Sequence, residues 1–505
     1  MLSRRTILKT LAVAPIVGTA ACTIQSAPRT AAVDTLRPLP IPPLAPSAVG
    51  SDGVRRFTLR ATSGNSEMIT GKQTATWGFN GAVLGPTLRA RRGERVAVAI
   101  TNDLPEPTTV HWHGMSIPAE FDGGPHQMIP SGSSAEPRWT IEQQAATLWY
   151  HPHPHGTTQR HVLRGLSGLF LVDDADSDSL DLPKTYGVDD IPVIIQDRRF
   201  TAEGAIDEAD NSDIGSLGDT IITNGISNAY LSITTGAVRM RILNGSSGRI
   251  YNLGMSDNRS FDVVGSDGGL LPSPVTMRRI QLSPGERAEI VIRISPGENV
   301  TLTSNPISDH GGVKKSDAAQ FGMVDRFDIL RLRCRPTLAH RSPTPTALVP
   351  ATRIVTDRAV HRYFDLQWFM INRKRMDMSR IDFEARVGGT EVWTVRNKDN
   401  WPHNFHVHDA QFQIIDIDGD RPPAYIAGRK DTVYIPPGGS VRFALRWSDH
   451  ADPMYPYMFH CHLLMHEDQG MMGQFLVLRP GQQAEPMTAM PGMGSMPETG
   501  AAHSH

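Results

Sequence analysis

Cysteine is scarce in this sequence of 505 residues, which contains only Cys22, Cys334 and Cys461. Cys22 ends an N-terminal apolar stretch, so two cysteines remain for the folded chain, and a disulfide framework is excluded. Cys334 lies in an alternating pattern typical of a strand. Cys461 lies between two histidines and needs a different explanation.

Long apolar runs and an excess of charge are also missing. Beyond the N-terminal region, no stretch is long enough to cross a membrane as a helix. The net charge is −2, so nothing favours a nucleic acid as a partner. The composition, 39% hydrophobic and 20% charged, is that of a soluble protein with a substantial core.

Residues 1–21 have the pattern of an export signal. Arg4 and Arg5 precede a short apolar stretch, which resembles a twin-arginine signal for proteins exported in the folded state. We therefore expect a protein of the periplasm or cell envelope. The letters T-A-A-C, ending at Cys22, loosely resemble a lipoprotein cleavage box, so Cys22 is either a lipid anchor or part of the discarded signal. Residues 22–50, rich in Pro, Ala and Ser, predict an unstructured tether.

Period-two patterns dominate the remaining sequence and predict an all-β protein, and 45 glycines with 38 prolines fit many turns. Three segments resemble one another: R-G-E-R-V-A-V-A-I-T-N ending at Asn102, T-G-A-V-R-M-R-I-L-N ending at Asn244, and G-G-T-E-V-W-T-V-R-N ending at Asn397. The asparagines are roughly 150 residues apart, which is the length of a domain. The sequence therefore predicts three tandem β-sandwich domains, over residues 51–175, 190–335 and 350–480.

Four pairs of histidines stand out. The first and third copies each carry one pair nine residues after the asparagine and a second pair near their end, whereas the middle copy has none and is predicted to be a spacer. Residues i and i+2 of a strand point to the same side, so each pair directs two imidazoles into one space. Eight imidazoles fit a cluster of three metal ions held by two, three and three histidines. The eight are His111, His113, His151, His153, His406, His408, His460 and His462.

Cys461 separates the two histidines of the last pair, so on a strand its side chain points away from the cluster. His466 and Met471 follow, and His403 comes from the neighbouring strand region. Two histidines, one cysteine and a weak methionine form a blue-copper electron-transfer site. An electron would travel roughly 10 Å to the cluster, mostly through bonds, at about 3.3 Å per strand residue.

Simpler explanations cover single features but not the set. Zinc explains one or two histidine pairs, but it is redox-inert and gains nothing from an adjacent cysteine path. His155, which extends the second pair of the first copy, is interpreted as a surface residue or a neighbour of the ligands. His126, His161 and His450 are interpreted as structural histidines.

These motifs resemble those of the multicopper oxidases, the family of laccases, bilirubin oxidases and bacterial cuprous oxidases. The resemblance covers residues 55–478, and the matching segments are H-W-H-G, W-Y-H-P-H-P-H-G, H-N-F-H-V-H and H-C-H-L-L-M-H-E-D-Q-G-M-M. It implies three cupredoxin-like Greek-key β-sandwich domains and four copper ions: one type 1, one type 2 and a type 3 pair.

The resemblance also implies which residues bind each copper. The type 1 copper takes His403, Cys461, His466 and axial Met471. The type 2 copper takes His111 and His406, and the type 3 pair takes His113, His151 and His462 on one ion and His153, His408 and His460 on the other.

Two acids lie close to these ligands in sequence, Asp122 nine residues after His113 and Glu467 directly after His466. Family members of this type carry carboxylates at both places as proton donors. Asp122 and Glu467, together with Cys461, are therefore the predicted catalytic residues. The alternative is that both acids only orient histidines or bridging waters.

The resulting prediction is a monomeric oxidase that takes single electrons from a small reductant near His403 and His466 and reduces O2 to water. The reductant stays open between Cu(I), phenolic or aromatic compounds, tetrapyrroles and Mn(II), so copper tolerance, laccase-like, bilirubin-oxidase-like and manganese-oxidising roles are alternatives. Cuprous oxidases carry a methionine-rich insertion in the third domain, which is short here, and Asp399 stands where they have a copper-binding acid. Trp401, two residues before His403, replaces the methionine of the cuprous oxidases, and a tryptophan at this position resembles bilirubin oxidase instead.

Two other classes compete with this prediction. A copper-binding or structural protein on the same fold, as in some cell-division relatives, has lost ligands, whereas every ligand position is filled here. Copper nitrite reductase uses two such domains and forms trimers, which the third domain and the four histidine pairs argue against.

Residues 481–505 predict a disordered tail rich in methionine and histidine. Thioethers prefer Cu(I), and imidazoles accept Cu(II), so the tail is either a copper collector or an oxidation-prone end. Its candidate ligands are Met487, Met490, Met493, Met496, His503 and His505.

Overall fold

Three buried asparagines mark equivalent points in three β-sandwiches. Asn102, Asn244 and Asn397 each end a strand, and each side chain donates through Nδ2 to two backbone carbonyls and accepts at Oδ1 the N–H two residues ahead. A buried amide that satisfies these backbone groups is costly to remove, so it pins the same turn in every copy.

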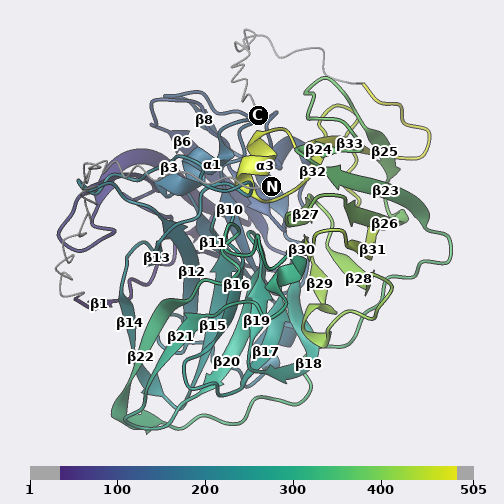
Figure 1. Ribbon diagram of the computed structural model, residues 1–505. Coiled ribbons are helices and arrows are strands. Elements are labelled where there is room, and N and C mark those ends of the chain that lie inside the picture. Colours follow the sequence, from purple (N-terminus) through teal and green to yellow (C-terminus); the bar gives the residue numbers. More distant parts are fainter. Residues whose placement is uncertain (1–34, 486–505) are drawn as a thin grey trace, which may run out of the picture. The chain divides into compact units, whose positions relative to one another are not determined.

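The computed structural model describes residues 35–485, and its strands form six sheets in three pairs (Figure 1). The all-β fold of three sandwiches predicted from the repeat is therefore confirmed. Among the described residues, no helix is long and apolar enough to cross a membrane. The export signal, Cys22 and the tail beyond residue 485 lie outside the described residues and stay predictions.

The first sandwich combines a six-stranded with a four-stranded sheet. The larger sheet contains β2 (Ala48–Val49), β3 (Val54–Ser66), β4 (Thr74–Phe79), β6 (Arg95–Asn102), β8 (Ser134–Ala135) and β9 (Arg138–Thr140). The smaller contains β5 (Leu88–Arg91), β7 (His111–His113), β10 (Ala146–His151) and β11 (Gly168–Asp173), and the connections include η1 (Ala119–Phe121), α1 (Thr158–Arg164) and α2 (Ala175–Ser179). Two of the predicted histidine pairs thus lie on or directly after β7 and β10.

The middle sandwich combines two six-stranded sheets. One contains β12 (Asp190–Arg198), β13 (Thr220–Thr223), β15 (Ala237–Asn244), β17 (Phe261–Ser266), β18 (Gly269–Met277) and β20 (Arg287–Arg293). The other contains β1 (Arg37–Pro38), β14 (Ala229–Thr235), β16 (Tyr251–Met255), β19 (Ile280–Leu282), β21 (Asn299–Ser304) and β22 (Phe327–Ala339), with η2 (His310–Gly312) before β22. β22 extends past residue 335, where the second domain was predicted to end.

The third sandwich combines a six-stranded with a five-stranded sheet. The first contains β23 (Val360–Gln367), β24 (Met370–Ile371), β26 (Thr390–Asn397), β28 (Phe412–Ile417), β29 (Arg429–Lys430) and β31 (Ser440–Arg446). The second contains β25 (Phe383–Arg386), β27 (His403–Val407), β30 (Thr432–Ile435), β32 (Tyr457–His460) and β33 (Met472–Leu478), with η3 (Ala424–Ile426) and α3 (Leu464–Asp468) in the connections.

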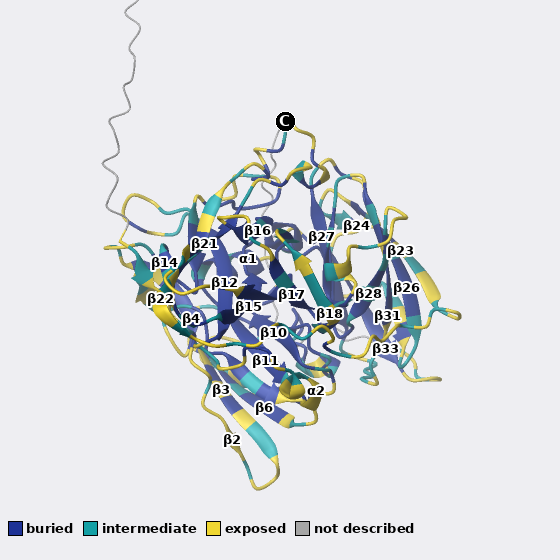
Figure 2. Cartoon of the chain, turned by 90° about the horizontal axis from the view of Figure 1, so that it is seen from below, coloured by how far each residue is buried: buried dark blue, intermediate teal, exposed yellow. Residues whose placement is uncertain are grey.

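Each sandwich has an apolar core of its own between its sheets. On β6, Val96, Val98 and Ile100 are at most 2% exposed, as the alternating pattern predicts. Burying one such side chain stabilises the fold by about 1.5–3 kcal/mol. Figure 2 shows β12 and β15 dark blue along their length, because in the middle sandwich both faces of these strands are covered.

Residues 37–49 do not form a free tether. β1 pairs in parallel with β14, and the following Leu39 enters the core of the middle sandwich. β2 pairs with β3 of the first sandwich. The tether predicted over residues 22–50 is therefore wrong for its described part. Its Pro-rich composition did not reveal that Leu39 finds an apolar site on another domain.

Candidate metal centres

The eight paired histidines lie together in one buried volume, where the first and third sandwiches meet. Strand pairing sets this arrangement: His111 of β7 lies opposite His151 of β10, and His406 of β27 lies opposite His460 of β32. Rings from the two domains then stack on each other, with centroids 3.8 Å apart for His111–His408 and 3.7 Å for His113–His406. All eight rings are at most 1% exposed: His111, His113, His151, His153, His406, His408, His460 and His462.

Three nitrogens converge in the tightest group. His460 Nε2 lies 3.2 Å from the Nε2 atoms of both His153 and His408, and one shared cation fits three such donors. His111 belongs to two further groups, one with His113 and His151 and one with His406 and His408. The ring of His462 packs on those of His113 and His151, with centroids 4.9 and 5.2 Å apart.

Hydrogen bonds fix which nitrogen of each ring faces the shared volume. His111 donates through Nδ1 to the Asp122 carbonyl, and His406 donates through Nδ1 to the Asp431 carbonyl. Each ring then presents Nε2. His113 is held in the opposite sense, since its Nε2 faces Asp431 Oδ1 at 2.9 Å and its Nδ1 is left over.

The presented nitrogens have the properties of metal donors. Burial, with the neighbouring imidazoles, holds the pKa of His113 and His406 well below its usual range and lowers that of His462 to about 3, so these rings are neutral. Buried polar atoms without a partner are costly. Those in the described chain include His111 Nε2, His113 Nδ1, His151 Nε2, His406 Nε2 and both nitrogens of His462. Bound cations would satisfy one nitrogen of each of these rings, so the residues fit the copper cluster predicted from the sequence.

Both predicted acids reach the outer nitrogens of this cluster. Asp122 Oδ2 accepts a hydrogen bond from His408 Nδ1 at 2.7 Å. Glu467 lies between two domains, with Oε1 3.3 Å from His153 Nδ1 and Oε2 3.2 Å from His460 Nδ1. Each carboxylate is at most 1% exposed and is therefore placed to orient rings and to exchange protons with the buried volume.

A second, smaller site lies on the other side of Cys461. The Nδ1 atoms of His403 and His466 are 3.0 Å apart, and Cys461 Sγ lies 3.6 and 3.5 Å from them. Burial raises the pKa of the Cys461 thiol to about 12, so a thiolate forms there only when a cation compensates its charge. Met471 is buried in the same core, and its carbonyl accepts the Cys461 N–H at 3.1 Å.

The outer nitrogens of this smaller site are also held. Asp399 Oδ2 lies 2.9 Å from His403 Nε2 and also accepts a hydrogen bond from the backbone N–H of Trp368. His466 Nε2 donates to the Asp213 carbonyl at 2.7 Å. Asp213 belongs to the middle sandwich, so the domain predicted to be only a spacer contacts a residue of this site.

Of the four other histidines discussed from the sequence, two make structural hydrogen bonds and two lie at least partly exposed. His126 bonds to Gln474, and His161 bonds to Glu106. His155 is exposed, and His450 is partly exposed. Sequence reasoning missed Asp431, whose only signal was its position directly before β30, the neighbour of β27.

Comparison with known proteins also indicates that copper is the metal of these sites. Two family profiles, each described as multicopper oxidase, match residues 60–177 and 343–481. The multicopper oxidase mco of Staphylococcus haemolyticus is 35% identical over 446 residues, covering 86% of this chain and 91% of that protein. The cell division protein FtsP of Escherichia coli is 33% identical over 457 residues, covering 87% and 93%.

A solved structure is similar over nearly the whole described fold. It is a bacterial laccase-like multi-copper oxidase from Ochrobactrum sp., with a TM-score of 0.78 and 34% identity. The match covers 87% of this chain and 100% of that one.

Proposed function

The chain belongs to the multicopper oxidase family, and on this premise we propose that it oxidises a small reductant at the Cys461 site and reduces O2 to water at the eight-histidine cluster. It is a copper-dependent oxidoreductase, since multicopper oxidases use O2 and a reductant. The assignment of two separate sites depends on one observation. Cys461 lies in the smaller site, whereas the side chains of its neighbours His460 and His462 lie in the eight-histidine cluster.

We assign four copper ions to these residues. His403, Cys461, His466 and Met471 would hold the type 1 ion. His111 and His406 would hold the type 2 ion, and the type 3 pair would be held by His113, His151 and His462 on one ion and by His153, His408 and His460 on the other. Bound copper supplies one-electron chemistry at the first site and the capacity for four-electron reduction of O2 at the second.

The protein provides the path between the sites. Cys461 is bonded through its backbone to both neighbouring histidines, so the thiolate and the cluster imidazoles belong to one short covalent segment. Asn404 stiffens this segment, because its Oδ1 accepts the His462 N–H at 2.6 Å and its Nδ2 donates to the Pro284 carbonyl at 2.8 Å. A rigid path favours electron transfer without rearrangement of the ligands.

Glu467 and Asp122 are proposed to hold and deliver protons. Reduction of O2 to two waters consumes four protons, and both carboxylates approach cluster imidazoles from outside. Glu467 has no hydrogen-bond partner at either oxygen among the described residues, although both oxygens lie within ion-pair distance of a ring. A carboxylate with free acceptor capacity is suited to taking up and releasing a proton.

An aromatic reductant is favoured over the other candidates. Trp368 is 51% exposed, and its ring meets that of Trp401 edge to face. Its backbone N–H bonds to Asp399, which contacts His403. The similar Ochrobactrum enzyme is described as acting on lignin model compounds and lignosulfonate. O2 uptake measured side by side with a phenol and with Cu(I) tests this: faster turnover with the phenol supports it, and turnover with Cu(I) alone overturns it.

A non-enzymatic role is the second candidate, because some relatives are named as cell division proteins. The complete ligand set argues against that role here, and O2 uptake dependent on bound copper would exclude it.

We further propose export by the twin-arginine route to the cell envelope, as a monomer, with Cys22 as a lipid attachment point. Cell fractionation with Arg4→Lys/Arg5→Lys and with Cys22→Ala tests the export route and the anchor separately.

A further inference from the structure

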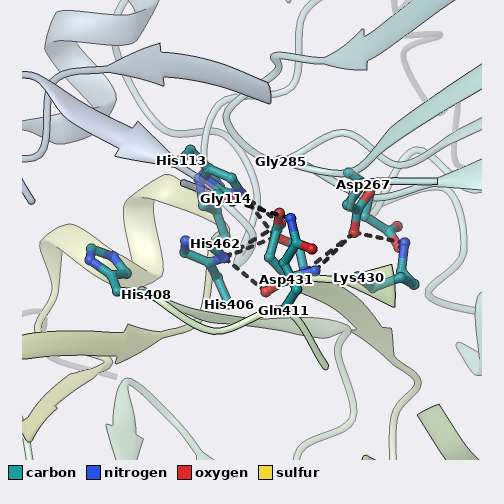
Figure 3. Close-up of polar contacts among 12 residues, drawn as sticks. His113, Gly114, Asp267, Gly285, His406, His408, Gln411, Lys430, Asp431 and His462 are labelled. Carbon is teal, nitrogen blue, oxygen red and sulfur yellow. Dashed lines mark hydrogen bonds and ion pairs between the residues drawn. The ribbon is translucent and has the colours of Figure 1, made fainter. Parts of the chain in front are cut away.

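Asp431 contacts one imidazole from each of the two outer domains. Its Oδ1 lies 2.9 Å from His113 Nε2, and its backbone carbonyl lies 2.8 Å from His406 Nδ1. Thr432 Oγ1 supports both contacts, at 3.1 Å from the first nitrogen and 3.2 Å from the second. Figure 3 shows Asp431 between these rings on one side and Asp267 with Lys430 on the other.

Arg287 of the middle sandwich holds Asp431 in place. Its guanidinium forms a two-pronged ion pair with the carboxylate, with Nη1–Oδ1 at 2.7 Å and Nη2–Oδ2 at 2.5 Å. The other three N–H groups donate to the carbonyls of Thr147, Gly285 and Asp267. All five donors of the side chain are therefore used, on acceptors from three domains.

Asp431 and Arg287 lie in fully buried, charged surroundings. Both side chains of the ion pair are 0% exposed, and Lys430 adds further buried ion pairs to Asp267 and Glu286. Gly114, which follows the first histidine pair, has a φ of +84°, and a Cβ at this position would lie 2.4 Å from Asp431 Oδ2. Glycine is therefore required in the H-W-H-G motif so that the carboxylate can reach the ring beside it.

We propose that Arg287 and Asp431 form an interdomain clamp that sets the donor atoms of His113 and His406, so that docking of the middle sandwich assembles the copper cluster. The inference rests on the proposed function, because it concerns the same cluster. Arg287 is a positioning residue: it touches neither ring and acts through Asp431. The middle sandwich then prepares the cluster, in addition to separating the outer domains.

The clamp has a definite chemical consequence. A neutral imidazole carries one N–H, and the carboxylate keeps that N–H on His113 Nε2 because a carboxylate only accepts. Nδ1 is then free to bind a cation. Without a fixed acceptor at Oδ1, the proton can move to Nδ1 and direct an N–H at the metal position.

The test compares Asp431→Asn, Arg287→Met and the double variant with Arg249→Met in the full chain loaded with Cu(II). Arg249 is the matched control: it is 3% exposed and forms a buried ion pair with Asp197 inside the middle sandwich, without touching an imidazole. Arg287→Lys keeps the charge but not the fork, so it serves if the methionine variant does not fold. The readouts are copper per chain after dialysis, the electron paramagnetic resonance spectrum of bound Cu(II), and thermal unfolding.

We expect Asp431→Asn to bind cluster copper about 10- to 100-fold more weakly and to change the spectrum of the remaining Cu(II), because the amide places a donor against the Arg287 fork in either orientation. Arg287→Met and Arg287→Lys should change the same signal. The fold loss of copper affinity in the double variant should be smaller than the product of the two single losses, since both residues act through one contact. Arg249→Met should lower stability and leave the spectrum unchanged.

Unaltered copper content and spectra in the Asp431 and Arg287 variants would overturn the clamp. So would an equal spectral change in Arg249→Met, because the effect would then be one of general stability. A wild-type chain that binds no copper at the cluster would overturn the proposed function instead, and the two failures are thereby distinguished.

Discussion

His460 and Cys461 are neighbours in the chain, yet their side chains face two different sites. His460 Nε2 lies 3.2 Å from two cluster imidazoles, whereas Cys461 Sγ lies 3.5 Å from His466 Nδ1. The alternation of side chains at the end of β32 produces this division. It links a site suited to one-electron oxidation with a site suited to O2 through a single peptide unit.

Met471→Leu should raise the reduction potential of the Cys461 copper while the thiolate absorption persists. Removing a weak axial donor destabilises Cu(II) and makes the surroundings drier. Redox titration of the loaded protein measures the change. An unchanged or lower potential would mean that Met471 is not axial and would point to Met472.

Glu467→Gln should slow reoxidation of the fully reduced enzyme by O2, by roughly 100-fold or more, while reduction through Cys461 stays near the wild-type rate. The amide is nearly isosteric but cannot relay a proton. Stopped-flow reoxidation tests this in samples of equal copper content. Asp468→Asn is the control, because Asp468 is the adjacent, half-buried acid, and its carboxylate accepts the N–H groups of Thr158 and Gln159 instead of facing the cluster imidazoles. Equal reoxidation rates in Glu467→Gln and wild type would remove Glu467 from the mechanism.

Trp368→Gly should raise the KM for a phenol and leave the KM for ferrocyanide unchanged. Trp368 adopts a φ of +56° at the turn between β23 and β24, a conformation that glycine adopts without strain and a bulky residue does not. We therefore expect the free energy of unfolding of the variant to exceed that of the wild type by about 1 kcal/mol. Equal KM values for the phenol would show that the exposed ring does not bind the reductant.

Acid should destabilise the chain through His161, among other buried histidines. Burial lowers the pKa of His161 to about 4, below the value of about 6.5 in an unfolded chain. Between these values the unfolded state binds the proton and the folded state does not, so the stabilisation is complete above pH 6.5 and is lost as pH falls toward 4. From pH 7 to 5, His161→Gln should lose about 2 kcal/mol less free energy of unfolding than wild type. Denaturant unfolding of the copper-free protein at both pH values measures this, and an equal loss would contradict the assignment.

Local spacing carried most of what the sequence could predict. The roles of the His-x-His pairs and of Cys461 follow from strand geometry over a few residues. The structure gathers the paired histidines in one buried volume and places Cys461 with His403 and His466 in another. The clamp could not be predicted in this way. Arg287 and Asp431 are 144 residues apart and belong to different domains, and nothing in either segment marks its partner. The same applies to Leu39, whose core position depends on a distant sandwich.

The central claim is that Cys461 belongs to one copper site and its two neighbours to another. The most direct test is the copper content of the loaded full chain beside that of Cys461→Ser, since a serine hydroxyl is a poor copper ligand. The account predicts four copper ions per wild-type chain and close to three in the variant, with the visible thiolate absorption and turnover lost. A variant that stays coloured and active, or a wild-type chain that holds only one or two copper ions, would contradict it.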